Sequence, residues 1–204
     1  MIKVGLTGGY ATGKSFVAAE LEKLGCHLIY ADRLGHTVLE PGGEAYAPTV
    51  KEFGPQILNA DGRIDRKRLA GIVFGSAECL EKLSGFVHPA VMRLEDEMAE
   101  HVRSHDPNGI VVIEAAILIE TGRYKALDRL ILTTCSEERQ IARAIKRDDL
   151  TREEALARIR RQMPAAEKQK YADFVVDTEG DKAATLDRVR NVHHQLKRLG
   201  EAKE

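Results

Sequence analysis

A glycine-rich motif near the start of the chain is the strongest chemical signal in the sequence. Residues 8–15 read GGYATGKS and fit the pattern G-x-x-x-x-G-K-[ST] of a phosphate-binding loop. The segment before the motif is strand-like and the segment after it is helix-like, which is the setting such a loop requires. Backbone N–H groups of the loop would face phosphate oxygens at the positive end of the helix dipole. Lys14 would reach the β- and γ-phosphates, and the Ser15 hydroxyl would hold Mg²⁺.

The motif predicts that ATP or GTP binds, and an ordinary tight turn with a surface lysine is the weaker alternative. A GTPase usually carries an Asn-Lys-x-Asp motif, which this sequence lacks. A motor or transporter ATPase usually has an aspartate at the end of an apolar strand, for which Glu114 is the nearest candidate and Asp177 a weaker one. A small-molecule kinase needs an acceptor pocket, a carboxylate near the acceptor hydroxyl, and arginines that neutralise the transferred phosphoryl group.

Asp32 is the candidate carboxylate. It follows the predicted second strand, at the edge where open α/β sheets bind ligands. There it could accept the proton of an attacking hydroxyl or help to hold magnesium. An N-cap for the following helix is an equally good interpretation of an aspartate at this position, and the two roles are compatible.

A polar stripe is predicted on the helix that Ser136 would cap. Gln140, Arg143 and Arg147 follow Ser136 with the spacing of one helix face. Such a stripe could cradle polyphosphate, because arginine offers planar bidentate donors. A solvated face, with Arg147 paired to Asp148 or Glu154, is the alternative. Ile141, Ala142, Ala144 and Ile145 are expected to anchor the other faces to the core.

Five apolar, β-branched runs predict the strands that would position these residues. They are Ile2–Thr7, Cys26–Tyr30, Ile110–Glu114, Leu130–Thr134 and Phe174–Asp177. Helical patterns separate several of them, so we expect an α/β fold with a parallel sheet. Residues 1–31, 106–149 and 172–204 are expected to form a nucleotide-binding core. Residues 32–105 are expected to be a helical insertion, and residues 150–171 a helical lid over ATP or only a solvated surface helix.

Composition excludes several classes of protein. The 204 residues suit one domain with insertions, and 43% hydrophobic residues suit an ordinary core. With 31 basic and 32 acidic residues, the net charge of −1 argues against nucleic acid as a partner. No apolar run is long enough for a membrane span, no signal peptide is evident, and three scattered cysteines form no disulfide pattern. We therefore expect a cytoplasmic protein that binds no membrane, with a monomer slightly preferred.

Ordered motifs along residues 2–195 resemble the dephospho-CoA kinase family. The phosphate-binding loop alone is common to many kinases, whereas the ordered set of motifs is specific. The motifs that carry the resemblance are residues 5–15, Ala31-Asp32, Phe53-Gly54, Asp61-Gly62, Asp65-Arg66 with Leu69, His88-Pro89, residues 117–120, Gln140 to Asp148, Arg158-Ile159 with Gln162, Ala172-Asp173, Val176-Asp177 and Gly180.

The resemblance implies the fold of nucleoside monophosphate kinases and phosphorylation of the 3′-hydroxyl of 3′-dephospho-CoA by ATP with Mg²⁺. It implies catalytic roles for Asp32, Lys14 and Arg143, and a metal site at Ser15 and Asp32. The implied ATP-binding residues are Gly8, Gly9, Ala11, Thr12, Gly13, Lys14, Ser15, Phe16 and Arg147. The implied substrate-binding residues are Thr7, Asp32, Asp65, Arg66, His88 and Leu118, although His88 is slightly better interpreted as a buried capping histidine before Pro89.

The sequence departs from the family pattern at four positions. Tyr30 stands in place of the first Asp of Asp-Ala-Asp, Ala116 in place of Pro, and Thr178 in place of Asn. Tyr10-Ala11 replaces Ile-Gly in the loop, so we expect Ala11 to have a negative φ. Alternatives to this family are another small-molecule kinase, of the nucleoside monophosphate or shikimate type, and a nucleotide-dependent binding switch with little catalysis of its own.

Overall fold

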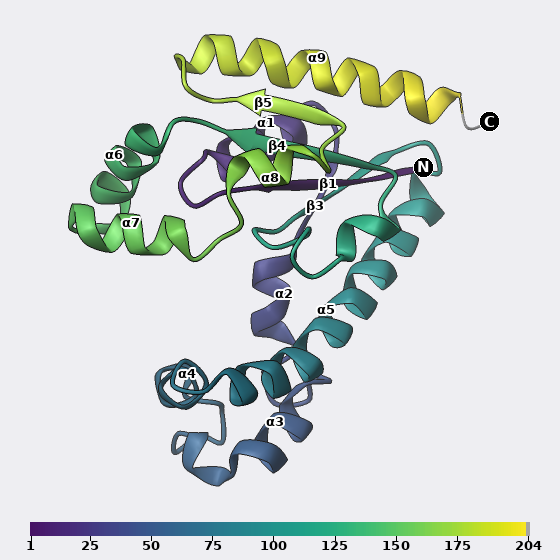
Figure 1. Ribbon diagram of the computed structural model, residues 1–204. Coiled ribbons are helices and arrows are strands. Elements are labelled where there is room, and N and C mark those ends of the chain that lie inside the picture. The colour runs from purple at the N-terminus through teal and green to yellow at the C-terminus, as the bar shows by residue number, and fades with distance from the viewer. Residues whose placement is uncertain (203–204) are drawn as a thin grey trace. The chain divides into compact units, whose positions relative to one another are not determined.

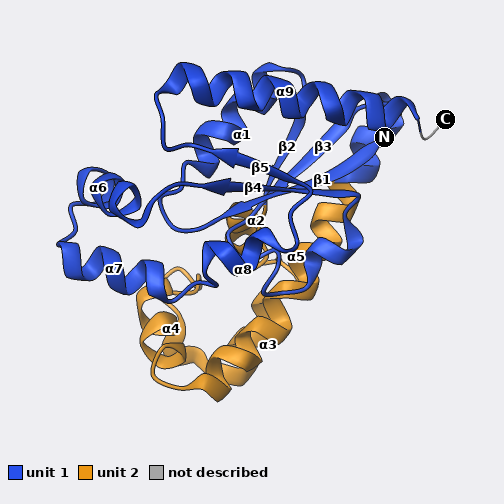
Figure 2. Cartoon of the chain, turned by 45° about the horizontal axis from the view of Figure 1, so that its top comes forward, with its two compact units in different colours: residues 1–30, 99–204 blue, residues 31–98 orange. Residues whose placement is uncertain are grey.

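The computed structural model describes residues 1–202 and divides the chain into two compact units. One unit comprises residues 1–30 and the chain from residue 99 onward, and the other comprises residues 31–98 (Figure 2). Because each unit has its own buried cluster of apolar side chains, each is described separately below.

The first unit is built on a five-stranded sheet. Its strands are β1 (Ile2–Gly8), β2 (His27–Tyr30), β3 (Ile110–Glu114), β4 (Arg129–Thr134) and β5 (Phe174–Asp177). Their order is β2-β3-β1-β4-β5, and every pair is parallel (Figure 1). The predicted α/β class with a five-stranded parallel sheet is confirmed, with strand ends that differ from the predicted ones by at most one residue.

One face of the sheet packs against α1 (Lys14–Lys23) and α9 (Lys182–Glu201). The core there includes Leu6 of β1, Val17 of α1 and Val189 of α9, each at most 1% exposed. The strands are continuously apolar because helices or loops bury both faces of a parallel sheet. The buried β1 therefore ends at a fixed point, where the phosphate-binding loop begins.

Three further helices of this unit follow β4 in the chain. They are α6 (Glu137–Asp148), α7 (Arg152–Arg160) and α8 (Ala165–Gln169). Ser136 caps α6 as predicted, since its hydroxyl accepts from the N–H of Arg139, and Thr151 forms a capping box with Glu154 at the start of α7. Ile141 and Ala144 are buried as expected. The expectation for Ala142 and Ile145 is wrong, because both are exposed.

The second unit is a set of helices joined by turns. It contains α2 (Ala31–Thr37), α3 (Tyr46–Phe53), the short 3-10 helix η1 (Pro55–Ile57), α4 (Arg66–Val73) and the first part of α5 (Ala77–His105), which continues into the first unit. Phe53, Ile57 and Leu69 belong to its core. The remaining 3-10 helix, η2 (Arg123–Ala126), lies between β3 and β4 in the chain.

Lys168 of α8 is fully buried within the first unit. Its Nζ donates to the carbonyl oxygen of Ala116 and pairs with Glu120, both at 2.8 Å. The same carbonyl accepts from the hydroxyl of Thr7 at 3.2 Å. Lys168 thereby joins the end of the segment 150–171 to the loop after β3.

Replacing Lys168 with Met is expected to lower the free energy of unfolding by about 2 to 3 kcal/mol, because it leaves Glu120 without its cation and the Ala116 carbonyl without this donor. Urea titration followed by circular dichroism measures the change. Lys170→Met is the matched control, since its ion pair with Glu167 is exposed and should contribute less than about 0.5 kcal/mol. Equal decreases in the free energy of unfolding for the two variants would show that the buried ion pair stabilises the protein no more than the exposed one.

Candidate functional site

The predicted phosphate-binding loop connects β1 to α1 and is held against β4. A Cβ atom added to Gly8 would lie 2.1 Å from Oγ1 and 2.7 Å from the carbonyl oxygen of Thr133, so a side chain at this position has no room. The hydroxyl of Thr12 lies 2.8 Å from that of Thr133 and donates to the carbonyl oxygen of Gly9 at 2.8 Å. These contacts fix the loop at the carboxyl end of the buried β1.

Ala11 has a φ of 58°, and the expectation of a negative φ is therefore wrong. Gly13, two residues later, has a φ of 90°. The curl of the loop requires the left-handed region at both positions, and an alanine there costs about 1–2 kcal/mol. Ala11 packs against a buried apolar cluster that consists of Ile141 and Ala144 of α6 and Ala155 of α7.

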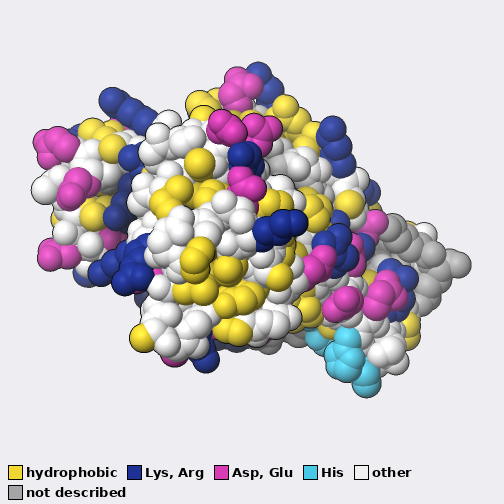
Figure 3. Space-filling model, turned by 90° about the horizontal axis from the view of Figure 1, so that it is seen from below, with side chains coloured by type: hydrophobic (Ala, Val, Ile, Leu, Met, Phe, Trp, Pro, Cys, Tyr) yellow, Lys and Arg dark blue, Asp and Glu magenta, His cyan; other side chains and the backbone are white. Residues whose placement is uncertain are grey.

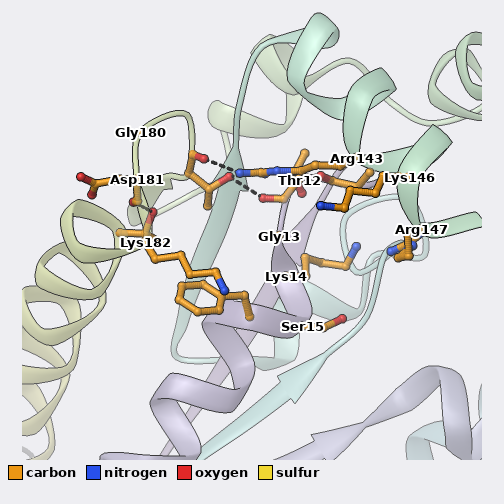
Figure 4. Close-up of a pocket in the computed structure, with 14 residues that line it drawn as sticks. Thr12, Gly13, Lys14, Ser15, Arg143, Lys146, Arg147, Gly180, Asp181 and Lys182 are labelled. Carbon is orange, nitrogen blue, oxygen red and sulfur yellow. Dashed lines mark hydrogen bonds between the residues drawn. The ribbon is translucent and has the colours of Figure 1, made fainter. Parts of the chain in front are cut away.

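A cavity of about 520 Å³ opens beside this loop (Figure 4). Its walls come from the loop and the first turn of α1, from α6, and from the turn between β5 and α9. It contains six of the predicted ATP-binding residues between positions 11 and 16, together with Arg143 and Arg147. The predicted Gly8 and Gly9 support the loop and do not line the cavity. Residues that the sequence did not single out for ATP are Lys146, Thr178, Gly180, Asp181, Lys182 and Thr185.

The cavity is strongly cationic. Its lining contains three lysines and two arginines but a single acidic residue, Asp181, whose carboxylate caps α9 by accepting from the N–H of Ala184. Figure 4 shows the side chains of Lys14, Lys146 and Arg147 directed into the same part of the cavity. Nζ of Lys14 also donates to the carbonyl oxygen of Gly8 at 3.1 Å. Basic groups at the start of a helix form a site for a polyphosphate anion.

Arg143 is held rigidly against the turn after β5. Its guanidinium donates to the hydroxyl of Thr178 at 2.8 Å and to the carbonyl oxygen of Thr178 at 2.6 Å. The hydroxyl of Thr178 in turn donates to the carbonyl oxygen of Thr12 at 2.8 Å. A solvated face is therefore the wrong interpretation for Arg143. For Arg147 both interpretations hold, because it lines the cavity and pairs with Asp148 at 2.7 Å.

Gln140 and Gln162 bring two amide groups to the back of the loop. Gln140 is 7% exposed and donates to the carbonyl oxygen of Cys135 at 3.4 Å. A Cβ atom on Gly9 would lie 3.2 Å from Oε1 of Gln140 and 3.9 Å from Oε1 of Gln162. These side chains therefore pack against Gly9. Within the predicted polar stripe of α6, Gln140 supports the loop, whereas Arg143 and Arg147 line the cavity.

The predicted residues Thr7 and Leu118 are both buried, at 0% and 2% exposure, and neither lines the cavity. Glu114, the carboxylate at the end of β3, is 7% exposed and pairs in register with Leu6 and Tyr30. The position that Tyr30 occupies is thus directly beside a buried carboxylate on the neighbouring strand.

Four predicted residues lie in the second unit. Asp32 is in the first turn of α2, which begins at Ala31, so its interpretation as an N-cap is wrong. Asp65 caps α4 by accepting from the N–H groups of Lys67 and Arg68. Arg66 is half exposed and pairs with Glu40 at 3.5 Å.

His88 lies inside the long helix α5, next to Pro89. It therefore caps no helix, and that interpretation is wrong. The side chain is half-buried, and burial lowers the pKa of its imidazole below the usual value.

Within residues 1–202, no helix combines the length and the apolar character that a membrane span needs. On the face drawn in Figure 3, several Lys and Arg side chains gather in a band at the left, and elsewhere basic, acidic and hydrophobic side chains are mixed.

Comparison with known proteins gives consistent matches over nearly the whole chain. A family model described as dephospho-CoA kinase matches residues 2–184. The dephospho-CoA kinase of Carboxydothermus hydrogenoformans is 38% identical, over 95% of this chain and 94% of that protein. Among solved structures, a Thermus thermophilus protein called TT1252 superimposes with a TM-score of 0.81 at 34% identity, covering 95% and 96% of the two chains. The dephospho-CoA kinase of Campylobacter jejuni superimposes with a TM-score of 0.71 at 26% identity, covering 96% and 97%.

Proposed function

This chain belongs to the dephospho-CoA kinase family, and from that premise we propose how its own residues carry out the reaction. The protein is an ATP-dependent kinase that transfers the γ-phosphate of ATP to the 3′-hydroxyl of 3′-dephospho-CoA and yields CoA and ADP, the last step of coenzyme A biosynthesis. The observation that carries the proposal for its site is the cationic cavity at the phosphate-binding loop. A nucleoside monophosphate or shikimate kinase is not favoured.

The nucleotide occupies this cavity, with its phosphates at the loop. Backbone N–H groups of residues 9–15 and the ammonium of Lys14 bind the β- and γ-phosphates, where negative charge develops as the phosphoryl group moves. Arg147 and Lys146 line the same cavity and add to this positive field. Arg143, fixed by Thr178 and Thr12, needs no reorganisation when charge develops, which makes it a preorganised electrostatic group.

Asp32 is the proposed acceptor of the proton from the 3′-hydroxyl. It follows the last residue of β2 by two positions, and a carboxylate is the usual group for this task in kinases. Residues 32–105 are the proposed acceptor domain, in which Asp65, Arg66 and His88 contact the substrate. Thr7 of β1 and Leu118 of the turn after β3 help to shape the site. Residues 150–171 are the proposed lid, and residues 1–31, 106–149 and 172–204 the nucleotide-binding core.

The residues present fit a magnesium ion that is bound mainly by nucleotide. The Ser15 hydroxyl is exposed and lines the cavity beside Lys14. No group of three or more His, Cys, Asp or Glu side chains in residues 1–202 could hold a metal by itself. Mg²⁺ commonly takes one or two protein oxygens and completes its shell with phosphates and water. Ser15 and Asp32 are the proposed protein ligands, and the ion would neutralise charge on the phosphates.

The reaction is proposed to take place in the cytoplasm. Cys26, Cys79 and Cys135 are all free thiols, as expected of a protein from a reducing compartment. A monomer is the proposed oligomeric state.

An acceptor panel tests the proposed function. Purified protein is incubated with ATP, Mg²⁺ and one of dephospho-CoA, AMP, CMP, shikimate or no acceptor, and the product is identified by mass and by the position of the new phosphate. Turnover with dephospho-CoA alone, giving a 3′-phosphate, is the expected result. Phosphorylation of a different acceptor would be consistent with the proposed nucleotide site but would show that dephospho-CoA is not the substrate.

Removing the metal should abolish turnover. With excess EDTA we expect no product above the uncatalysed rate, and full activity after Mg²⁺ is added back. Ser15→Ala is expected to raise the Mg²⁺ concentration for half-maximal rate by about tenfold, because one hydroxyl ligand is lost. Ser15→Thr keeps that hydroxyl and serves as the control. A Ser15→Ala variant with the wild-type Mg²⁺ requirement would contradict the proposed ligand.

A further inference from the structure

Tyr10 is an aromatic residue inside the phosphate-binding loop, and it contacts charged side chains from two helices. Its ring centroid lies 5.1 Å from the guanidinium carbon of Arg147 on α6 and 5.6 Å from that of Arg158 on α7. A guanidinium within about 6 Å of an aromatic ring is attracted by the ring quadrupole. Tyr10 thus brings two cations from different helices to one ring.

The Tyr10 hydroxyl completes the arrangement with two hydrogen bonds. It accepts from Nη1 of Arg158 at 3.0 Å and donates to Oδ2 of Asp148. Asp148 also accepts two hydrogen bonds from Arg147, through Nε at 2.8 Å and Nη2 at 2.7 Å. The hydrogen bonds from Arg147 and Tyr10 lower the pKa of Asp148 to about 2, so this carboxylate stays charged near neutral pH. The guanidinium of Arg147 is consequently held both by the Tyr10 ring and by the Asp148 carboxylate.

The Tyr10 ring is also part of an apolar cluster between the two helices. Ile141 and Ala144 of α6 and Ala155 of α7 are its buried members, and Leu156 and Ile159 of α7 pack against them. An aliphatic residue in place of Tyr10 could fill this space. It would offer neither a π-face nor a hydroxyl, so the packing alone does not account for a tyrosine.

From this juxtaposition we propose that Tyr10 is a positioning residue that presents Arg147 and Arg158 to the phosphates of ATP and couples the loop to α7. Arg147 already lines the cavity, whereas Arg158 does not line it and is held by its hydrogen bond to the Tyr10 hydroxyl. Tyr10 is uncharged, so it holds Arg147 and Arg158 together without neutralising either of them. Asp148 adds one negative charge, and the net charge of these residues is therefore positive. The proposal rests on ATP being the nucleotide bound in the cavity.

A double-mutant cycle on ATP binding tests the proposal. Tyr10→Ile is expected to weaken ATP binding about tenfold and Tyr10→Phe, which keeps the ring, about threefold, as the loss of cation–π contacts and a charged hydrogen bond implies. Arg158→Gln should weaken binding about tenfold in the wild-type background but less than about threefold beside Tyr10→Ile, since two groups that act together are not additive. Calorimetric titration with ATP measures the affinities of the wild type and of these four variants.

Tyr124→Phe is the matched control, because Tyr124 lies on η2 and does not line the cavity. We expect it to bind ATP as the wild type does. Equal losses from Arg158→Gln in both backgrounds, or wild-type affinity in Tyr10→Ile, would overturn the proposal. Thermal unfolding is followed for each variant. If Tyr10→Ile fails to fold, the cycle is run with Tyr10→Phe, which keeps the ring but removes the hydrogen bond to Arg158, and Arg158→Gln must then weaken ATP binding less than it does in the wild-type background.

The test separates this proposal from the proposed function. ATP titration requires no acceptor. If the protein fails to phosphorylate dephospho-CoA but the effects of the two substitutions are non-additive, the proposed role of Tyr10 stands and the proposed acceptor is wrong. If the protein phosphorylates dephospho-CoA but the effects of the two substitutions on ATP binding are additive, the proposed function stands and the proposed role of Tyr10 is wrong.

Discussion

Lys14→Met is expected to lower kcat for dephospho-CoA phosphorylation by about 10²–10³, the usual effect of removing one preorganised group that stabilises charge in a transition state. The ammonium of Lys14 lines the cationic cavity and is oriented by the carbonyl oxygen of Gly8 at 3.1 Å. Methionine has a similar length but no charge, so the loop should keep its packing while the developing charge on the γ-phosphate loses its counterion. Initial rates at saturating ATP and acceptor measure the effect.

Lys23→Met is the matched control for this variant. Lys23 lies at the other end of the same helix, is 70% exposed and pairs with Glu20 at 2.6 Å. We expect it to retain the wild-type kcat. Thermal unfolding of both variants shows whether the helix is intact. A Lys14→Met protein that folds and keeps more than about a tenth of the wild-type rate would remove Lys14 from the catalytic groups, since a factor of ten is far below the effect expected of such a group.

Asp32→Asn is expected to lower kcat by about 10²–10⁴, the range that a positioned general base contributes. Asparagine keeps the shape of the side chain but does not accept the proton of the 3′-hydroxyl at neutral pH. The ATP dissociation constant should stay within about twofold, because the variant leaves the phosphate-binding loop unchanged. Rapid-quench kinetics with dephospho-CoA and calorimetric titration with ATP measure the two quantities separately.

The control for Asp32 is Asp61→Asn, an aspartate of the same unit that is 63% exposed and contacts Arg63 at the surface. It should leave kcat unchanged. Full turnover by Asp32→Asn would exclude the carboxylate as the base. A nucleotide-dependent switch would instead bind ATP with little turnover of any acceptor, and its function would be left intact by Asp32→Asn.

The phosphate-binding loop and the sheet that carries it could be predicted from the amino-acid sequence. Local patterns suffice for both, because each strand is a short apolar run and the loop is a contiguous motif whose neighbours are a strand and a helix. The cap of α6 is equally local, since Ser136 bonds to an N–H three residues away. These features depend on side chains that are close along the chain.

The site is completed by contacts between residues that are far apart in the sequence, and these contacts could not be predicted from local patterns. Arg143 is held by Thr178, which is 35 positions away, and Thr178 reaches back to Thr12 across the sheet. Sequence spacing assigns Ile145 to an anchoring face, yet it is 41% exposed, because which faces of α6 are covered depends on the loop and on α7. The positive φ of Ala11 was missed for a related reason. A local rule disfavours that conformation for alanine, but the loop, fixed at both ends by β1 and α1, imposes it.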